Sequence, residues 1–486
     1  MESVDRVLHR LQFRVRLALL ASLAIACRCA QAQNPTSATN PFLGSVTASP
    51  AAQGVLRLTL DGAIGRGLEN NLGLKEAEED EKALKGERNV ALQQFLPTLA
   101  IHGDTGVYQH NLIAFGFKPS LLNTFSALFP GGKPPANFPF VTRDDLTQGQ
   151  IQYSQTLFSG PVIAALKAAG SALSAADHQR IVARGTVVQQ VAASYLRAIA
   201  ASSQVDNARA LVAQAQVLLD HARAAHEAGV AAHLEELRAQ VQLQAQQQAL
   251  ISAQNEEEKD LILLKREIGI DPGQQIDLTD PAPSSELTAK TREELLASAY
   301  RYRHDYLTLQ NQAAELKSAH LAYRTQRLPS LSFQGYWGTA TVNGAGTHGA
   351  MAAVGTLSVP LFREARLRGD EEASQAQLNA ANNELADLRD RIDEQIRMAL
   401  LDLEAARELV GVARSTVELS TRALSDETER VNAGVDDNLP LVTAQATLAS
   451  AQSNLVESLY QYNVAKLSLA TAAGVIESRY RDYLGR

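Results

Sequence analysis

Two short segments of the sequence carry side chains that could act on ions. Each segment lies just after an Ala-Gly-Val tripeptide, and the four acids are Glu235, Glu236, Asp436 and Asp437. Clustered carboxylates attract cations, repel one another, and form salt bridges with nearby arginines or lysines. The alternative interpretation is solvated acids in the first turn of a helix, where negative charge is favourable to the helix dipole.

Three histidines, His221, His226 and His233, lie close to the first of these segments. Imidazole binds metals and changes its charge near neutral pH. However, a glycine turn interrupts any helical register between His226 and His233, and no compact ligand motif is present. We therefore interpret all three as exposed helix histidines, and we expect no metal site and no cofactor.

No sequence motif predicts catalysis. The chain contains no phosphate-binding glycine loop after a strand, no G-x-S-x-G and no H-E-x-x-H. Its net charge of −8 over 486 residues argues against a nucleic-acid partner, which needs a basic surface. Few aromatic residues (5%) and abundant Ala, Leu and Gln favour long helices over an α/β enzyme. We expect a protein that is not an enzyme.

The first 32 residues have the features of an export signal peptide. Basic residues precede a short apolar core, and Ala30-Gln31-Ala32 supplies the small residues of a cleavage site. Cleavage before Cys27, with attachment of lipid, is the alternative. The chain's 2 cysteines, Cys27 and Cys29, both lie in this region, which excludes a disulfide framework in the body. Residues 33–56 are polar and are predicted to be disordered or extended.

Long proline-free stretches predict helices, because proline disrupts helix interiors. These stretches are rich in Ala, Leu, Gln, Glu and Arg, and their apolar residues recur three or four positions apart. If residues 162–228 form one helix, it is about 100 Å long. Thr291 and Glu294 form a predicted capping box at the start of a later helical region.

The sequence repeats itself in order and spacing, which indicates an internal duplication. The two Ala-Gly-Val tripeptides are 205 residues apart. We predict a first repeat at 57–270, a linker at 271–290, a second repeat at 291–476 and a tail at 477–486. The turns and strand ends that recur are Pro97 with Pro329, Leu157 with Leu361, and Phe158 with Phe362.

Four short segments alternate apolar and polar residues with period two. They predict strands near 98–110, 147–158, 330–342 and 349–361. One apolar and one polar face is typical of a strand between lipid and water, whereas a soluble hairpin pair is the alternative. The intervening loop at 111–145 either folds across a barrel mouth or against lipid headgroups, or it is a flexible outer loop.

Four strands cannot close a transmembrane barrel, because the smallest such barrels have about eight. Open strand edges are not tolerated in hydrocarbon. Three copies would supply twelve strands. We therefore predict a mainly α protein with membrane β structure. It is internally duplicated, and its homotrimer forms a 12-stranded β-barrel continued by a 12-helix α-barrel tunnel.

The run from Gly434 to Gln445 reads G-x-x-x-x-L-x-L-x-x-A-Q, and with the doubled motifs it resembles the TolC-like outer membrane efflux proteins over about 57–476. The resemblance implies an exit duct in the outer membrane, with a helical tunnel in the periplasm, for tripartite efflux or type I secretion. It implies a periplasmic adaptor and an inner-membrane RND, ABC or MFS transporter as partners. The implied docking tips are Ala228, Gly229, Val230, Ala433, Gly434 and Val435.

The chain departs from that family at the entrance. The family often carries an aspartate before the Ala-Gln pair, and here the position is Thr443, with Arg238 as its first-half equivalent. Our entrance candidates are Glu235, Glu236, Arg238, Asp436, Asp437 and Thr443. A secreted or envelope coiled-coil structural protein and a stand-alone trimeric porin are the alternative functions.

Overall fold

The computed structural model describes residues 40–46, 50, 54–129, 131, 138–229, 232–288, 290–361, 363–433 and 438–485. The predicted signal peptide and Cys27 lie outside the described residues, and so do Val230, Phe362, Gly434, Val435, Asp436 and Asp437. The chain divides into two compact units. The first comprises Met1–Asp80, His178–Tyr306 and Leu388–Arg486, and the second comprises Glu81–Asp177 and Leu307–Asp387.

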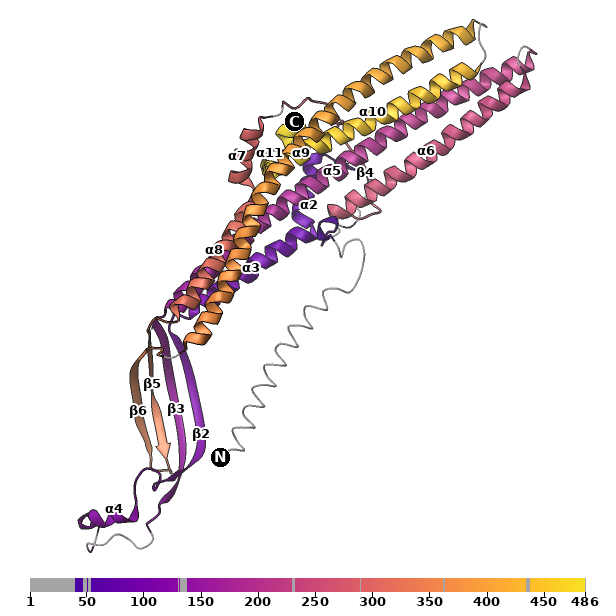
Figure 1. The fold of residues 1–486 in the computed structure, drawn as a ribbon. Helices are drawn as coiled ribbons and strands as arrows, with labels where there is room; N and C mark the ends of the chain where they lie inside the picture. The colour runs from indigo at the N-terminus through magenta and orange to yellow at the C-terminus, as the bar shows by residue number, and fades with distance from the viewer. Residues whose placement is uncertain are drawn as a thin grey trace. The chain divides into compact units, whose positions relative to one another are not determined.

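Helix lengths recur along the chain (Figure 1). Helices of 11, 22, 68 and 35 residues are followed by helices of 11, 22, 69 and 35 residues. The first set is α2 (Leu60–Asn70), α3 (Leu72–Gln93), α5 (Gly160–Glu227) and α6 (His233–Glu267). The second set is α7 (Arg292–Tyr302), α8 (His304–Thr325), α9 (Glu364–Asn432) and α10 (Asn438–Ala472).

One antiparallel sheet lies in the second unit, with strand order β2-β3-β5-β6. Its strands are β2 (Thr98–Asn111), β3 (Val141–Phe158), β5 (Ser330–Val342) and β6 (Thr347–Ser358). β3 begins six residues before the predicted start, because Arg143 to Asp145 are polar and hide the strand from a period-two search. The connection between β2 and β3 is therefore shorter than 111–145, and it contains α4 (Pro119–Thr124) and the 3-10 helix η2 (Ser126–Leu128).

The register of the sheet aligns an apolar row across all four strands. Ile101 pairs with Ile151, Ile151 with Trp337, and Trp337 with Met351. All four side chains are exposed, Ile101 at 87% and Met351 at 73%. The adjacent row, on the opposite face, contains His102. The sheet thus exposes large apolar side chains that its own chain does not cover.

Several short elements have no counterpart in the sequence predictions. Strand β1 (Leu56–Leu58), at the boundary between the predicted N-terminal segment and the first repeat, pairs in parallel with β4 (Ile276–Leu278) in the predicted linker. The 3-10 helix η1 (Pro41–Leu43) is fixed by Asn71, whose amide donates to the Phe42 carbonyl at 2.7 Å. Helix α11 (Ile476–Leu484) begins at the last residue of the predicted second repeat and covers most of the predicted tail; it buries Ile476, Tyr480, Tyr483 and Leu484.

The capping box at the start of α7 is confirmed. The Thr291 hydroxyl accepts from the Glu294 amide, and the Glu294 carboxylate accepts from the Thr291 amide. Among the described helices, none combines the length and the apolar character that crossing a membrane requires.

Candidate docking tips and channel entrance

The first tip joins α5 to α6 through a glycine turn. The Gly229 amide donates to the His226 carbonyl at 2.9 Å, and Gly229 has φ +74°, a left-handed conformation that glycine adopts without strain. Ala228 and Gly229 are both exposed. In the second tip, Ala433 is exposed and its amide donates to Glu429 at 2.9 Å. The described part of both tips therefore offers exposed small residues.

A small-residue core in the first unit holds the helices beneath the tips. Alanines and leucines from α5, α6 and α10 pack together, and short side chains allow the helices to approach closely. Val431 and Val442 flank this cluster. Its buried members are Ala215, Leu218, Leu219, Ala222, Ala239, Leu243 and Leu441.

The acids in the first turn of α6 are paired within the chain. Arg238 contacts Glu235 at 2.8 Å, and Arg223 contacts Glu236 at 3.4 Å. The two carboxylates are mostly buried, and Glu235 Oε2 has no hydrogen-bond partner among the described residues. Two of the four predicted entrance acids are thus partly neutralised by arginines. An electronegative entrance stays a prediction.

Thr443 is exposed on α10 and lines a groove of about 450 Å³ between α10 and α9. The α9 wall of this groove contains Glu427, whose Oε2 has no hydrogen-bond partner in the described structure. Arg430 lies 3.8 Å from this carboxylate. Sequence reasoning missed Glu427, because its position relative to Thr443 depends on how two antiparallel helices align.

The glycine turn brings two predicted histidines together. The rings of His226 and His233 have centroids 5.1 Å apart, and His233 Nδ1 lies 3.4 Å from Glu236 Oε2. His221, one turn further from the tip, is exposed. The sequence interpretation treated the turn as separating these side chains, whereas the reversal of chain direction places them side by side.

The predicted strand boundaries lie at the ends of helices and strands. Pro97 and Pro329 directly precede β2 and β5, while Leu157 and Phe158 end β3. Leu361, the predicted end of the last strand, lies three residues beyond the end of β6 and is 92% exposed. These positions mark changes of secondary structure.

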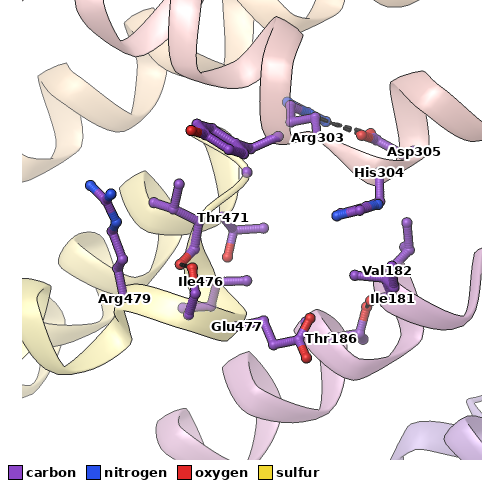
Figure 2. A pocket seen from close by; sticks show the side chains of 15 residues that line it. Ile181, Val182, Thr186, Arg303, His304, Asp305, Thr471, Ile476, Glu477 and Arg479 are labelled. Carbon is purple, nitrogen blue, oxygen red and sulfur yellow. Dashed lines mark hydrogen bonds and ion pairs between the residues drawn. The ribbon is translucent and has the colours of Figure 1, made fainter. Parts of the chain in front are cut away.

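A separate pocket of about 330 Å³ lies in the first unit, between α5, the α7–α8 junction and α10–α11 (Figure 2). Arg303 binds both oxygens of Asp305, at 2.7 and 3.1 Å, and also Gln395 at 2.7 Å. Burial alone would raise the pKa of Asp305, but hydrogen bonds and charge from Arg303 outweigh it and hold this pKa below its usual range. The walls already satisfy these polar groups, so we interpret the pocket as a structural joint.

Comparison with known proteins identifies the relatives of this fold. Residues 63–269 and 303–475 match the family described as outer membrane efflux protein. One curated relative, the outer membrane efflux protein BepC of Brucella suis, is 28% identical over 127 residues. That match spans 26% of this chain and only 28% of the relative's length.

Solved structures resemble the chain over most of its length. VceC of Vibrio cholerae superposes with a TM-score of 0.69 at 18% identity, covering 85% of this chain and 96% of VceC. The open state of MtrE of Neisseria gonorrhoeae superposes with a TM-score of 0.69 at 17% identity, covering 92% of this chain and 98% of MtrE. CmeC of Campylobacter jejuni superposes with a TM-score of 0.70 at 16% identity, covering 90% of this chain and 92% of CmeC. At such low identity, these likenesses show the fold.

Proposed function

The chain belongs to the outer membrane efflux protein family, and from this premise we propose that three copies of it form one exit duct. Membership in the family confirms the resemblance seen in the sequence and makes the chain an outer membrane efflux channel of the TolC-like type. It also sets aside the alternative of a coiled-coil structural protein. The family is one of channels and carries out no chemistry.

The observation that carries the trimer proposal is the sheet with two unpaired edges and an exposed apolar row. β2 and β6 each pair with one neighbour only, in the described structure. In hydrocarbon, unpaired backbone groups are not tolerated, so the edges require strands from other copies. Three four-stranded sheets supply twelve strands, an even number within the range of known barrels. The row Ile101, Ile151, Trp337 and Met351 would then face lipid.

Exposed apolar residues on the helices support the same assembly. Leu234, Leu237 and Val241 on α6 are about half exposed or more. Together with Val442 of α10 they line a second groove, of about 390 Å³. On α9 the exposed residues are Met398, Leu401, Leu409, Val412 and Leu419. We assign these surfaces to contacts with sister copies, which complete a twelve-helix tunnel.

We propose that the tips dock a periplasmic adaptor, which connects the duct to an inner-membrane transporter of the RND, ABC or MFS class. Ala228 and Ala433 are exposed at the two tips and suit reporter cysteines. Cross-linkers at either position should capture the cognate adaptor in cells. Cross-linkers at exposed Glu408 on α9 are the control, and equal capture there would contradict tip docking.

The trimer is tested by particle mass and by cross-linking between strand edges. Cys27 and Cys29 precede the predicted cleavage site, so engineered cysteines would be unique in the processed chain. A cysteine at His102 on β2 is combined in turn with one at His348, Ala350 or Ala352 on β6. The register of the sheet places these three residues on the same face as His102. We expect covalent dimers and trimers from at least one pair and none from the single cysteines. A stable one-copy particle in detergent would refute the assembly.

A further inference from the structure

We propose that His226, His233 and Glu236 form a binding site for a borderline divalent transition-metal ion, with Zn²⁺ as the reference case. His226 lies in the last turn of α5, and the other two lie in the first turn of α6. One ligand atom from each residue lies within 4.8 Å of the other two, and no other such trio occurs in the described ranges. Two imidazoles and one carboxylate are a ligand set that Zn²⁺ uses in proteins, with water in the open position.

One of the three separations between ligand atoms already matches that around a bound ion. Bonds of about 2.1 Å at tetrahedral angles place neighbouring ligand atoms about 3.4 Å apart. His233 Nδ1 and Glu236 Oε2 are already 3.4 Å apart. The rings of His226 and His233 are inclined at 38° rather than stacked flat. His233 is exposed and the other two side chains are partly buried, so binding requires small side-chain rotations that bring ligand atoms now within 4.8 Å of one another closer together.

The surroundings orient the carboxylate. Arg223 Nε donates to Glu236 Oε1 at 3.4 Å, which leaves Oε2 beside His233. A partner that fixes a ligating carboxylate supports metal affinity. The positive charge of Arg223 opposes that of the ion, but its side chain is 51% exposed and solvent screens the repulsion. The C-terminal end of α5 favours a cation beside His226, whereas the N-terminal end of α6 opposes it beside His233, so the helix dipoles give no net preference and the ligands themselves must supply the affinity.

The second tip lacks this ligand set. The 205-residue offset that pairs Gly229 with Gly434 places Val431, Asn438 and Leu441 at the equivalent positions. Leu441 belongs to the buried core, and Val431 packs against it. The metal site is therefore specific to the α5–α6 hairpin, where a bound ion would clamp the end of one helix to the start of the next.

The test is Zn²⁺ binding to the full chain in detergent, with any purification tag removed. Calorimetry measures affinity and stoichiometry, and visible absorption of the Co²⁺ form reports the ligands. His226→Gln and His233→Ala should each weaken binding by at least about tenfold. The matched control His221→Ala removes an exposed histidine outside the trio and should leave binding unchanged. Zn²⁺ should also slow trypsin cleavage after Arg223 and Arg238 in the parent but not in His233→Ala.

Equal affinity and stoichiometry in all of these proteins would overturn the proposal. A loss of binding in His221→Ala as large as in His233→Ala would also overturn it. Glu236→Gln retains the side-chain length and an oxygen for Arg223, so it is a second variant that keeps the local packing. Circular dichroism of each variant shows whether the fold is intact. These measurements report metal binding whatever the number of copies in the channel.

Discussion

The variant Glu267→Gln is predicted to gain stability over the parent protein as the pH rises from 4 to 8. Glu267 is the last residue of α6 and is 3% exposed. Burial raises the pKa of Glu267 from 4.5 to about 7, against the opposing effect of hydrogen bonds from Gln190 and Ser194. The C-terminal end of the helix adds a further unfavourable potential for a negative charge. This carboxyl therefore favours its neutral form in the folded chain.

The magnitude follows from the difference between folded and unfolded chains. The unfolded chain ionises this carboxyl near pH 4.5 and the folded chain near pH 7, so raising the pH through this interval favours unfolding. The loss of stability amounts to about 3 kcal/mol by pH 8. Gln cannot ionise, and its oxygen can still accept the hydrogen bond that Gln190 donates to Glu267 at 3.0 Å. The gap in unfolding free energy between Glu267→Gln and the parent should widen by about 3 kcal/mol from pH 4 to pH 8.

The assay is chemical unfolding in detergent at a series of pH values, followed by far-ultraviolet circular dichroism, which reports the helices. Glu408→Gln, an exposed carboxyl on α9, is the control and should show no comparable change with pH. If the difference in unfolding free energy between Glu267→Gln and the parent is the same at pH 4 and pH 8, the assignment of Glu267 as a buried carboxyl that resists ionisation is refuted.

Three further predictions concern other parts of the chain. Burial lowers the pKa of Lys466 from 10.5 to about 8. The unfolding free energy of the parent should therefore rise by up to about 3 kcal/mol relative to Lys466→Met between pH 8 and pH 10.5, measured by the same unfolding assay. Gly338→Ala should abolish heat-resistant trimers on gels, because a Cβ at this position would meet the Gly149 carbonyl oxygen and lie 2.5 Å from Gln150 Cα on β3. The control Gly349→Ala should retain these trimers, because the space around Gly349 is open. Replacing Asp436 and Asp437 with Ala should reduce block of single-channel current by divalent cations, and an unchanged current would remove these acids from the entrance.

The sequence was sufficient for features that depend on local rules. Proline positions and apolar periodicity predicted a helix over 162–228, and the structure has α5 from Gly160 to Glu227. Elements that depend on distant partners were not predicted. β1 and β4 have three residues each, too few to show a period, and they form because residues 220 positions apart pair. Helix α11 did leave a signal, since Ile476, Tyr480, Tyr483 and Leu484 fall on one helical face.

The entrance shows why spacing alone could not complete the site. The resemblance noted in the sequence leads us to expect an aspartate at position 443, where this chain has the uncharged Thr443. In the fold, Thr443 shares a groove with Glu427 of α9, which supplies a carboxylate to the same space from the opposite wall. The register between two antiparallel helices decides this placement, and core packing at residues such as Leu441 sets that register. If the entrance of this channel is acidic, its charge therefore comes from α9 as well as from the turn residues. The two repeats contribute differently to that charge, because the equivalent of Glu427 in the first repeat is the buried Ala222.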